Sequence, residues 1–272
     1  MNTKELAYLY DLYVAPDWNE RFAALIDEHV ALPERGRVLY IEAGTGGHVI
    51  ELSQRAGLET EVVATDSDAE RLALGEAKTT LVDEGAMPAF RPGQPDVLPF
   101  DDSSFDVVIA NASLVAPELL PDILREMTRV AAPGATIAVA FPSYSSFGEF
   151  YSIYWEALAS GEDSSHAGIV ESLIAKSPSV AHIEQLAAYE GLDEIQTWTN
   201  REDFEFASGE EFLQSPLIQN FLSEIWLEPL PDDDGTRDQA RANLINLIDD
   251  ERADGTWLFS IKATLLSGKR GE

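Results

Sequence analysis

A glycine loop and a downstream aspartate are the residues best suited to bind a ligand. The stretch VLYIEAGTGGHVIEL, residues 38–52, places Gly44 and Gly46 between a strand-like run and a helix-like run. Glycines there let a ligand approach the backbone, and free N–H groups at a helix start suit a carboxylate or phosphate. Asp66 ends the next apolar run, twenty residues after Gly46. An acid at that spacing typically accepts hydrogen bonds from ribose hydroxyls, so the two features predict a ribonucleoside ligand.

Two alternatives stay open at this point. Asp66 could cap the next helix without any ligand, and Ser67 or Asp68 could share that role. A nicotinamide enzyme also uses a glycine loop and an acid, but its G-x-G-x-x-G pattern expects a glycine where Val49 stands. The loop therefore indicates a nucleotide-like ligand without deciding which one.

Alternating strand and helix patterns must position this loop. Strand-like runs recur at RVLYIEA, EVVATD, AFRPG, FDVVIANA and TIAVAFP, and helix-like runs separate most of them. One of these helices is expected to begin near Pro117 and to end at Pro133-Gly134. Such alternation predicts an α/β fold with a parallel sheet covered by helices on both faces. The late strand DEIQTWTNREDFEFAS and the final strand TWLFSIKATLLSG predict an antiparallel hairpin that completes the sheet.

The text downstream of the loop resembles one family. LPFDDSSFDVVIANASL, residues 98–114, is followed by LREMTRVAAPGATIAVAFP, residues 124–142. Both stretches are similar to class I S-adenosylmethionine-dependent methyltransferases, in which a Leu-Pro-Phe turn precedes the Ser-Phe-Asp that opens the fourth strand. The resemblance covers residues 36–142, and FSIKATLLSGKR also resembles the family's last strand. It implies a three-layer Rossmann-like methyltransferase fold with a mostly parallel seven-stranded sheet, an antiparallel terminal hairpin and helical insertions. It also implies S-adenosylmethionine as the cofactor.

The resemblance assigns cofactor contacts residue by residue. Gly44 and Gly46 match the loop glycines that face the methionine part of the cofactor, and Asp66 matches the ribose acid. Gln94 stands where the family has an acid that meets the adenine amino group. Its carbonyl oxygen can accept the same hydrogen bond, although Asp96 is near enough to compete. The full expected cofactor set is Glu42, Gly44, Thr45, Gly46, Asp66, Ser67, Gln94, Asn111, Ala112 and Ser113.

The start of the loop departs from the family pattern, acid-x-Gly-x-Gly-x-Gly. Tyr40 replaces the acid and Glu42 replaces the first glycine. Because side chains alternate along a strand, both residues are expected to project to one face, about 6.6 Å apart. In one hypothesis, which we favour, the carboxylate has moved forward along that face and meets the cofactor's ammonium group. In the other, Glu42 blocks the methionine site or repels the cofactor's carboxylate, since a buried glutamate without a partner costs several kcal/mol or becomes protonated.

Methyl transfer by such a fold demands positioning more than side-chain chemistry. The sulfonium group is already activated, so the protein holds the acceptor in line and excludes water. A general base is needed only for a poorly nucleophilic acceptor. His48, His166 and His182 are candidates, but each also fits a structural or surface role. The sequence therefore assigns no catalytic residue.

Two aromatic-rich helical insertions interrupt the later part of the chain. Their aromatic residues recur at helical spacing: Phe147, Phe150, Tyr151, Tyr154 and Trp155, then Phe212, Phe221 and Trp226. Such stripes are typical of helix faces packed into a core. Alternatively, they line an apolar acceptor pocket above the carboxyl ends of the strands, with the N-terminal run YLYDLYVAP closing over the same place. An apolar, acid-rimmed pocket would favour a neutral or cationic small acceptor.

The charge of the chain disfavours several classes of partner. Its 49 acidic and 18 basic residues give a net charge of −31, which disfavours nucleic acid and anionic membrane surfaces. The first residues, MNTKELAYLYDLY, lack a secretory signal, and no apolar run has the roughly 18 residues of a membrane span, so a cytoplasmic location is expected. The absence of cysteine excludes disulfides and thiolate metal sites, and no metal is predicted. The acidity also fits solubility in high salt.

These observations predict a single domain over residues 1–272. Within it we expect an N-terminal helical cap, a cofactor-binding core, a helical lid or insertions and the C-terminal part of the sheet. Their expected ranges are 1–35 for the cap, 36–142 for the core, 143–180 and 207–252 for the insertions, and 181–206 and 255–269 for the sheet. The expected function is S-adenosylmethionine-dependent methyl transfer to a small, partly apolar acceptor. The alternatives are a non-catalytic binding or scaffold module on the same fold and, less favoured, a nicotinamide-dependent oxidoreductase.

Overall fold

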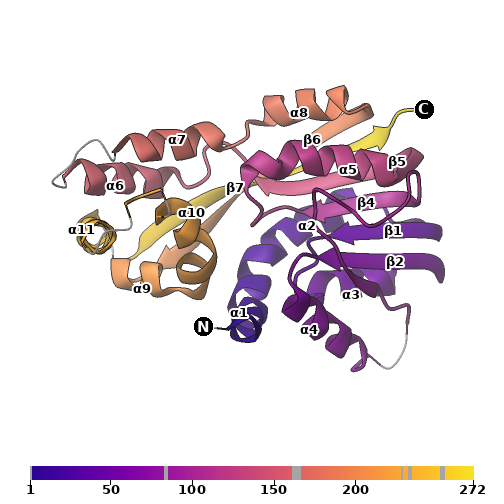
Figure 1. The fold of residues 1–272 in the computed structure, drawn as a ribbon, viewed down its shortest axis with the longest axis horizontal. Helices are drawn as coiled ribbons and strands as arrows, with labels where there is room; N and C mark the ends of the chain where they lie inside the picture. Colours follow the sequence, from indigo (N-terminus) through magenta and orange to yellow (C-terminus); the bar gives the residue numbers. More distant parts are fainter. Residues whose placement is uncertain (1, 83–84, 161–166, 228, 232–234, 252–254) are drawn as a thin grey trace. The chain divides into compact units, whose positions relative to one another are not determined.

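A seven-stranded sheet with helices on both faces organises the chain (Figure 1). The computed structural model describes residues 2–82, 85–160, 167–227, 229–231, 235–251 and 255–272. The strand order is β3-β2-β1-β4-β5-β7-β6. The strands are β1 (Arg35–Ile41), β2 (Glu59–Asp66), β3 (Ala89–Pro92), β4 (Phe105–Asn111), β5 (Ala131–Pro142), β6 (Leu192–Phe206) and β7 (Trp257–Arg270).

The helices fall into an N-terminal group, a group between the strands and a later group. The first is α1 (Thr3–Leu9), the π-helix η1 (Tyr10–Asn19) and α2 (Glu20–His29). The second is α3 (Gly47–Arg55), α4 (Ala69–Thr79), the 3-10 turn η2 (Pro117–Leu119) and α5 (Leu120–Val130). The third is α6 (Gly148–Ala159), α7 (Gly168–Lys176), α8 (Val180–Tyr189), α9 (Gly209–Gln214), the π-helix η4 (Ile218–Leu222), α10 (Ser223–Leu227) and α11 (Thr236–Glu251).

The strand directions confirm the predicted fold class. Strand β1 pairs in parallel with β2 and β4, and β2 with β3 and β4 with β5 pair in the same sense. Strand β7 runs against β5, because Lys269 Nζ contacts Thr136 near the start of β5 while Lys262 O accepts from Ser143 N beyond its end. The sheet is therefore mostly parallel and ends in an antiparallel hairpin.

The prediction that a helix ends at Pro133-Gly134 is wrong. Helix α5 stops at Val130, and both residues belong to β5. Phe105 pairs with Ala131, but Val107 pairs with Thr136, so β5 carries extra residues at this point of the ladder. Gly134 has a φ of +77°, which glycine adopts without steric cost. The Pro-Gly pair therefore forms an irregularity in a strand, as glycine in a strand often does.

The described residues form two compact units. The first contains residues 1–141, 179–199 and 264–272, and the second contains residues 142–178 and 200–263. Strands β6 and β7 contribute to both. The prediction of a single domain with a cap, a core and insertions stays a prediction.

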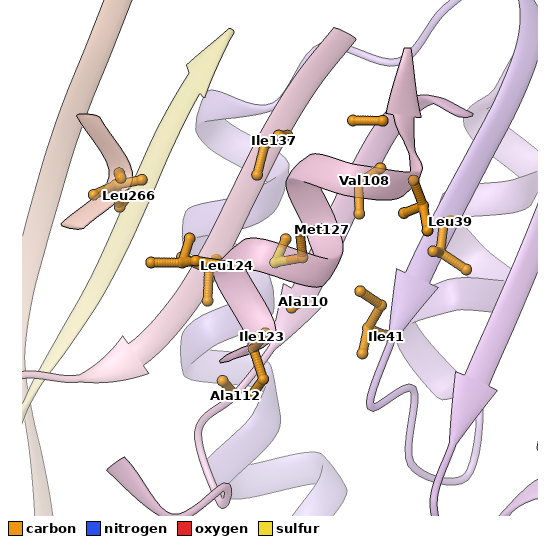
Figure 2. Close-up of a cluster of buried hydrophobic side chains, with 14 of the residues drawn as sticks. Leu39, Ile41, Val108, Ala110, Ala112, Ile123, Leu124, Met127, Ile137 and Leu266 are labelled. Atoms are coloured by element: carbon orange, nitrogen blue, oxygen red, sulfur yellow. The ribbon is translucent and has the colours of Figure 1, made fainter. Parts of the chain in front are cut away.

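Helix α5 covers one face of the sheet in the first unit. Figure 2 shows Ile123, Leu124 and Met127 of α5 in one buried cluster with the strand residues Leu39 and Val108. All five side chains are at most 1% exposed. A parallel strand buried on both faces reads as a nearly continuous apolar run, which is why the strands were recognisable in the sequence. This packing fixes the strands whose carboxyl ends carry the loop.

Two charged residues connect the two sequence stretches that resemble the family. Arg129 donates to the carbonyl oxygens of Phe100 (2.8 Å) and Leu98 (3.1 Å) and pairs with Glu126 and Asp102. Glu126 in turn accepts from Leu98 N at 2.8 Å, and the Arg129 guanidinium holds the pKa of this carboxyl below its usual range. Hydrogen bonds and ion pairs therefore join the Leu-Pro-Phe turn to the helix sequence REMTRV.

The aromatic stripes of the second unit are mainly core. The rings of Phe150 and Trp226 stack with centroids 4.0 Å apart, and Phe212 packs edge-on against Trp257 at 4.5 Å. The buried Tyr154 hydroxyl donates to Trp226 O at 2.7 Å. The core interpretation of these residues is confirmed, whereas Trp155 on α6 is 46% exposed and takes no part in this packing.

Candidate functional site

A small cavity lies at the carboxyl ends of β1 and β4 in the first unit. It has a volume of about 190 Å³. Glu42 and Thr45 reach it from the loop after β1, and Asn111 reaches it from the end of β4. Tyr40 also lines it, so Tyr40 and Glu42 meet at one cavity. Strand alternation is not the reason, because β1 ends at Ile41 and Glu42 has a left-handed backbone. Ligands of open α/β folds bind at this edge of the sheet.

The loop keeps the backbone that glycine allows. Gly44 and Gly46 have φ values of +58° and +81°, and Gly46 leads directly into α3. Glu42 has a φ of +55°, a left-handed conformation that costs a non-glycine residue about 1–2 kcal/mol. The chain therefore holds a glutamate in a backbone conformation suited to the glycine of the family pattern.

Asp66 ties the loop to the next helix. Its Oδ2 accepts from Gly44 N at 2.8 Å, and its Oδ1 accepts from Asp68 N at 2.8 Å. Arg71 on α4 binds Oδ1 as well, with its terminal nitrogen at 2.8 Å. Asp66 is 1% exposed, and this burial raises its pKa even though Arg71 opposes the shift. Both carboxylate oxygens thus have partners within the protein, and α4 is capped separately by Asp68.

Glu42 is a buried acid beside a second acid. Its side chain is 13% exposed and lies 3.8 Å from Arg71. Burial, followed by the charge of Asp66, raises the pKa of Glu42 to about 8, against the opposing effects of Arg71 and Ser67. Its Oε1 has no hydrogen-bond partner among the described residues. At neutral pH this carboxyl therefore holds a proton on the wall of the cavity.

Tyr40 belongs to a chain of hydrogen bonds that ends on α2. Its hydroxyl lies 2.8 Å from His48 Nδ1, and His48 Nε2 lies 2.8 Å from Asp27 Oδ1. Burial acts to raise the pKa of Asp27, but hydrogen bonds from His48 and Arg55 outweigh it and lower the pKa to about 2. Burial also raises the pKa of Tyr40. Tyr40 therefore keeps its proton, and His48 is held by partners on both ring nitrogens.

The π-helix η1 covers the loop. The Tyr10 ring lies where a side chain on Gly44 would project, within 2.6 Å of that position, and the Arg71 guanidinium lies 5.0 Å from the centre of this ring. Asp11 Oδ1 accepts from Thr45 Oγ1 at 2.5 Å and pairs with Lys78 on α4. Residues 3–19 are the part of the predicted 1–35 cap that covers the loop, and from here on 'the cap' means these residues. The N-terminal run thus closes over the glycine loop.

The expected cofactor residues are only partly gathered. Glu42, Thr45 and Asn111 line the cavity, and Ser67 lies close enough to influence Glu42. Gly44 joins Asp66 by a hydrogen bond, while Gln94 is exposed. Ala112 and Ser113 are buried after β4, and Gly46 packs near Phe90. The cofactor contacts of all ten residues stay predictions.

Sequence reasoning missed the residues that close the site. Arg71, Lys78 and Asp11 carry the ionic contacts around the loop. A signal was available, since basic residues are scarce in this chain and two of them fall on the helix directly after Asp66. Of the histidine candidates, His48 lines the cavity, His182 is exposed on α8, and His166 lies outside the described residues.

Membrane-spanning helices and metal-binding clusters are both absent from the described residues. No helix in that part of the chain is long and apolar enough to span a membrane. Within the same residues, no group of three or more histidine and acidic side chains is arranged to hold a metal ion.

The part of the chain that carries the loop is similar in sequence to known methyltransferases. A family model described as "Methyltransferase domain" matches residues 38–134. A demethylmenaquinone methyltransferase of Renibacterium salmoninarum is 35% identical over 51% of this chain and 54% of its own length. A norajmaline N-methyltransferase of Rauvolfia serpentina is 29% identical over 44% of this chain and 39% of its own. The chain thus spans about half the length of the curated relatives it matches.

Solved structures match over most of the chain but at low identity. The YcgJ protein from Bacillus subtilis has a TM-score of 0.62 and 17% identity, covering 93% of this chain and 99% of its own. A Haemonchus contortus phosphoethanolamine N-methyltransferase, solved with phosphomonomethylethanolamine and S-adenosylhomocysteine, has a TM-score of 0.54 and 14% identity over 94% of this chain and 53% of its own. These likenesses confirm the Rossmann-like methyltransferase fold.

Proposed function

We propose that this chain, which belongs to the class I methyltransferase family through its residues 38–134, transfers a methyl group from S-adenosylmethionine to a small acceptor. One observation carries the proposal. The strand–loop–helix that matches the family opens onto a cavity lined by Glu42, Thr45 and Asn111, at the edge of the sheet where such ligands bind. When bound, S-adenosylmethionine supplies an activated methyl group on sulfur.

The residues present fit this cofactor once the cap moves. The cavity of about 190 Å³ is smaller than the roughly 300 Å³ at which pockets for ligands of this size begin. Tyr10 fills the space above Gly44, and Arg71 occupies the carboxylate of Asp66. We infer that cofactor entry displaces Tyr10 from the loop. Asp66 would then exchange a partner for a ribose hydroxyl, while Gly44 and Thr45 would face the methionine part.

Glu42 supports a retained site more than a blocked one. A charged carboxylate here would repel the carboxylate of the cofactor, but the raised pKa keeps Glu42 largely neutral at pH 7. Its unpartnered Oε1 is an acceptor on the cavity wall that an ammonium group would satisfy. An entering cation would also favour ionisation of Glu42. We therefore propose that Glu42 binds the cofactor's ammonium group.

The acceptor is proposed to be a small uncharged or partly apolar molecule. The strongly negative chain disfavours nucleic acid and anionic membranes as partners. Two relatives are named for demethylmenaquinone and norajmaline, which are different acceptors, and the matched domain ends at residue 134. The acceptor must therefore be identified from the later residues of this chain. No base is proposed, because Tyr40 keeps its proton and His48 has partners on both nitrogens.

A non-catalytic binding module is the second candidate. It is favoured by the contacts that close the loop, namely Tyr10 over Gly44 and Arg71 on Asp66. If these contacts persist in solution, the loop is closed to any cofactor. Cofactor binding separates the two candidates.

Calorimetry with S-adenosylmethionine and S-adenosylhomocysteine tests the proposal on the wild type and Glu42→Gly. We expect both ligands to bind the wild type, and binding to weaken about tenfold in Glu42→Gly because a charge-assisted contact is lost. Titration with NAD(H) is the specificity control and should give no heat. Absence of binding to the wild type, with binding restored in Glu42→Gly, would instead identify a closed site.

A further inference from the structure

A second cavity lies entirely within the second unit. It has a volume of about 360 Å³ and lies among the loop after β5, α6 and α7. Tyr144 and Ser145 reach it from the loop, Tyr151 and Trp155 from α6, and Ile174 from α7. This volume falls in the range of sites for small molecules, about 300–1,000 Å³.

The lining of this cavity is unusual for such an acidic chain. The protein has 49 acidic and 18 basic residues, yet none of the described residues lining the cavity carries a carboxylate, an ammonium, a guanidinium or an imidazole group. An anionic ligand would find no opposite charge among these residues, and its desolvation would go uncompensated. A cation would find only aromatic faces there. The described lining therefore favours an uncharged ligand over an anion.

Two aromatic rings beside the cavity have free faces. Tyr144 is 53% exposed and Trp155 is 46% exposed. Among the described residues, neither ring makes a ring–ring contact, whereas the neighbouring Tyr151 packs against Phe147 and Phe150. Large exposed aromatic rings at a concave surface mark places where ligands bind. Their open faces suit a flat ring system, which prefers offset stacking or edge-to-face packing.

The cavity also offers a fixed polar group. Tyr151 is 7% exposed, and its hydroxyl lies near Trp226 and near Ser177, which also lines the cavity. Burial raises the pKa of Tyr151 to about 12, so the hydroxyl stays protonated and can donate. Ser145 and Ser152 add hydroxyls that donate or accept. A few polar groups in an apolar wall are what orients a ligand in such sites.

The loop that carries Tyr144 is held in a strained conformation. Ser145 and Phe147 have φ values of +74° and +65°, which cost non-glycine residues about 1–3 kcal/mol each. Tyr144 N donates to Pro178 O at 2.8 Å, and Phe147 N donates to Ser260 O at 2.9 Å. These contacts fix the loop at two places, so the position of Tyr144 is determined by the fold.

We propose that this cavity binds an uncharged planar aromatic or conjugated molecule, stacked on Trp155 and Tyr144 and hydrogen-bonded through its hydroxyl or carbonyl oxygen to Tyr151. That this ligand is the methyl acceptor rests on the proposed function. Its binding does not, because every residue in the argument lies outside the matched domain at residues 38–134.

Three probes of different charge test the proposal by calorimetry without cofactor. They are 2-naphthol, which is neutral, 2-naphthoate, which presents the same rings with a negative charge, and choline, which is a compact cation suited to aromatic cages. We expect 2-naphthol to bind at least tenfold more tightly than the other two. Tighter binding of 2-naphthoate or choline, or no binding of 2-naphthol, overturns the proposal.

Variants locate the binding. Trp155→Ala should weaken 2-naphthol about tenfold, and Tyr151→Phe about fivefold, with circular dichroism confirming that both fold. Tyr189→Ala removes an aromatic ring that is 85% exposed on α8, and it should leave the affinity unchanged. Equal affinity for wild type and Trp155→Ala overturns the proposal.

Comparing the 2-naphthol titration with the S-adenosylmethionine titration distinguishes this proposal from the proposed function. If 2-naphthol binds while S-adenosylmethionine does not, the cavity assignment stands and methyl transfer fails. If the cofactor binds while 2-naphthol does not, the reverse holds.

Discussion

Replacing Glu42 with glutamine should remove a specific pH dependence of stability. Burial and the neighbouring Asp66 raise the pKa of Glu42 from its ordinary value of 4.5 to about 8. The unfolded chain releases this proton near pH 4.5, whereas the folded protein keeps it until about pH 8. Stability from this group is therefore complete below pH 4.5 and is lost as the pH rises through 8.

The magnitude follows from the same two pKa values. Each pKa unit corresponds to about 1.4 kcal/mol, so the full difference approaches about 5 kcal/mol. Glutamine has the same size and stays neutral at every pH. Glu42→Gln should therefore match the wild type at pH 5 and exceed it by about 3–5 kcal/mol at pH 8.5, where the wild type is ionised in both states.

Urea denaturation at several pH values between 5 and 8.5 measures this difference, since urea does not screen charges as a salt would. Glu51→Gln, which removes an exposed acid on α3, is the matched control and should differ little from the wild type throughout. Carbon-13 resonances of the glutamate carboxyls, compared between wild type and Glu42→Gln, give the titration directly. A stability difference that stays constant from pH 5 to 8.5 would refute the reasoning.

Three further predictions concern the cap, the turn at residues 98–102 that Arg129 binds, and the core. Asp11→Asn weakens the contacts that hold the cap to Lys78 and Thr45, so calorimetry should show cofactor affinity about fivefold higher, while Asp17→Asn in the exposed pair with Arg21 leaves it unchanged. Arg129→Lys loses the forked contacts to Leu98 and Phe100, and denaturation should show a loss of about 1–3 kcal/mol; an unchanged midpoint would mean that these contacts are dispensable. Leu124→Ala opens a cavity under α5 and should cost about 2–5 kcal/mol; a loss below 1 kcal/mol would contradict the packing in Figure 2.

The fold was predictable because its determinants are periodic and local. Val108 and Ile109 lie in a run apolar enough to be buried on both faces, and burial is what the structure shows. The turn at residues 98–102 and the helix residues Glu126 and Arg129 were recognisable as a pattern because they bind one another. The Pro133-Gly134 error has the same origin, since the sequence cue for a helix end is also the cue for an irregular strand.

The closure of the site was not predictable in the same way. Lys78 binds Asp11 across 67 positions, and Thr45 binds Asp11 across 34. Such contacts leave no periodic signal, because they depend on where the fold brings isolated charges together. The sequence indicated that the N-terminal run could close over the ends of the strands, but not that Tyr10 would lie on Gly44 itself. Tyr40 and Glu42 line one cavity, but strand alternation does not explain it, because β1 ends before Glu42 and the backbone there is left-handed.

The two departures from the family pattern, Tyr40 in place of an acid and Glu42 in place of a glycine, are best understood together. Tyr40 is buried, and its hydroxyl lies 2.8 Å from His48 Nδ1. A hydrogen-bonded hydroxyl therefore takes the place of the acid that the family has at this position. Glu42 instead occupies a left-handed backbone and a buried position, and Arg71 at 3.8 Å offsets only part of that cost. An apolar side chain at 42 would close the loop at lower free energy, because it would leave no unpartnered oxygen. The cost of burying the Glu42 carboxyl is therefore offset only when the cavity receives a hydrogen-bond donor. The ammonium group of the proposed cofactor is such a donor.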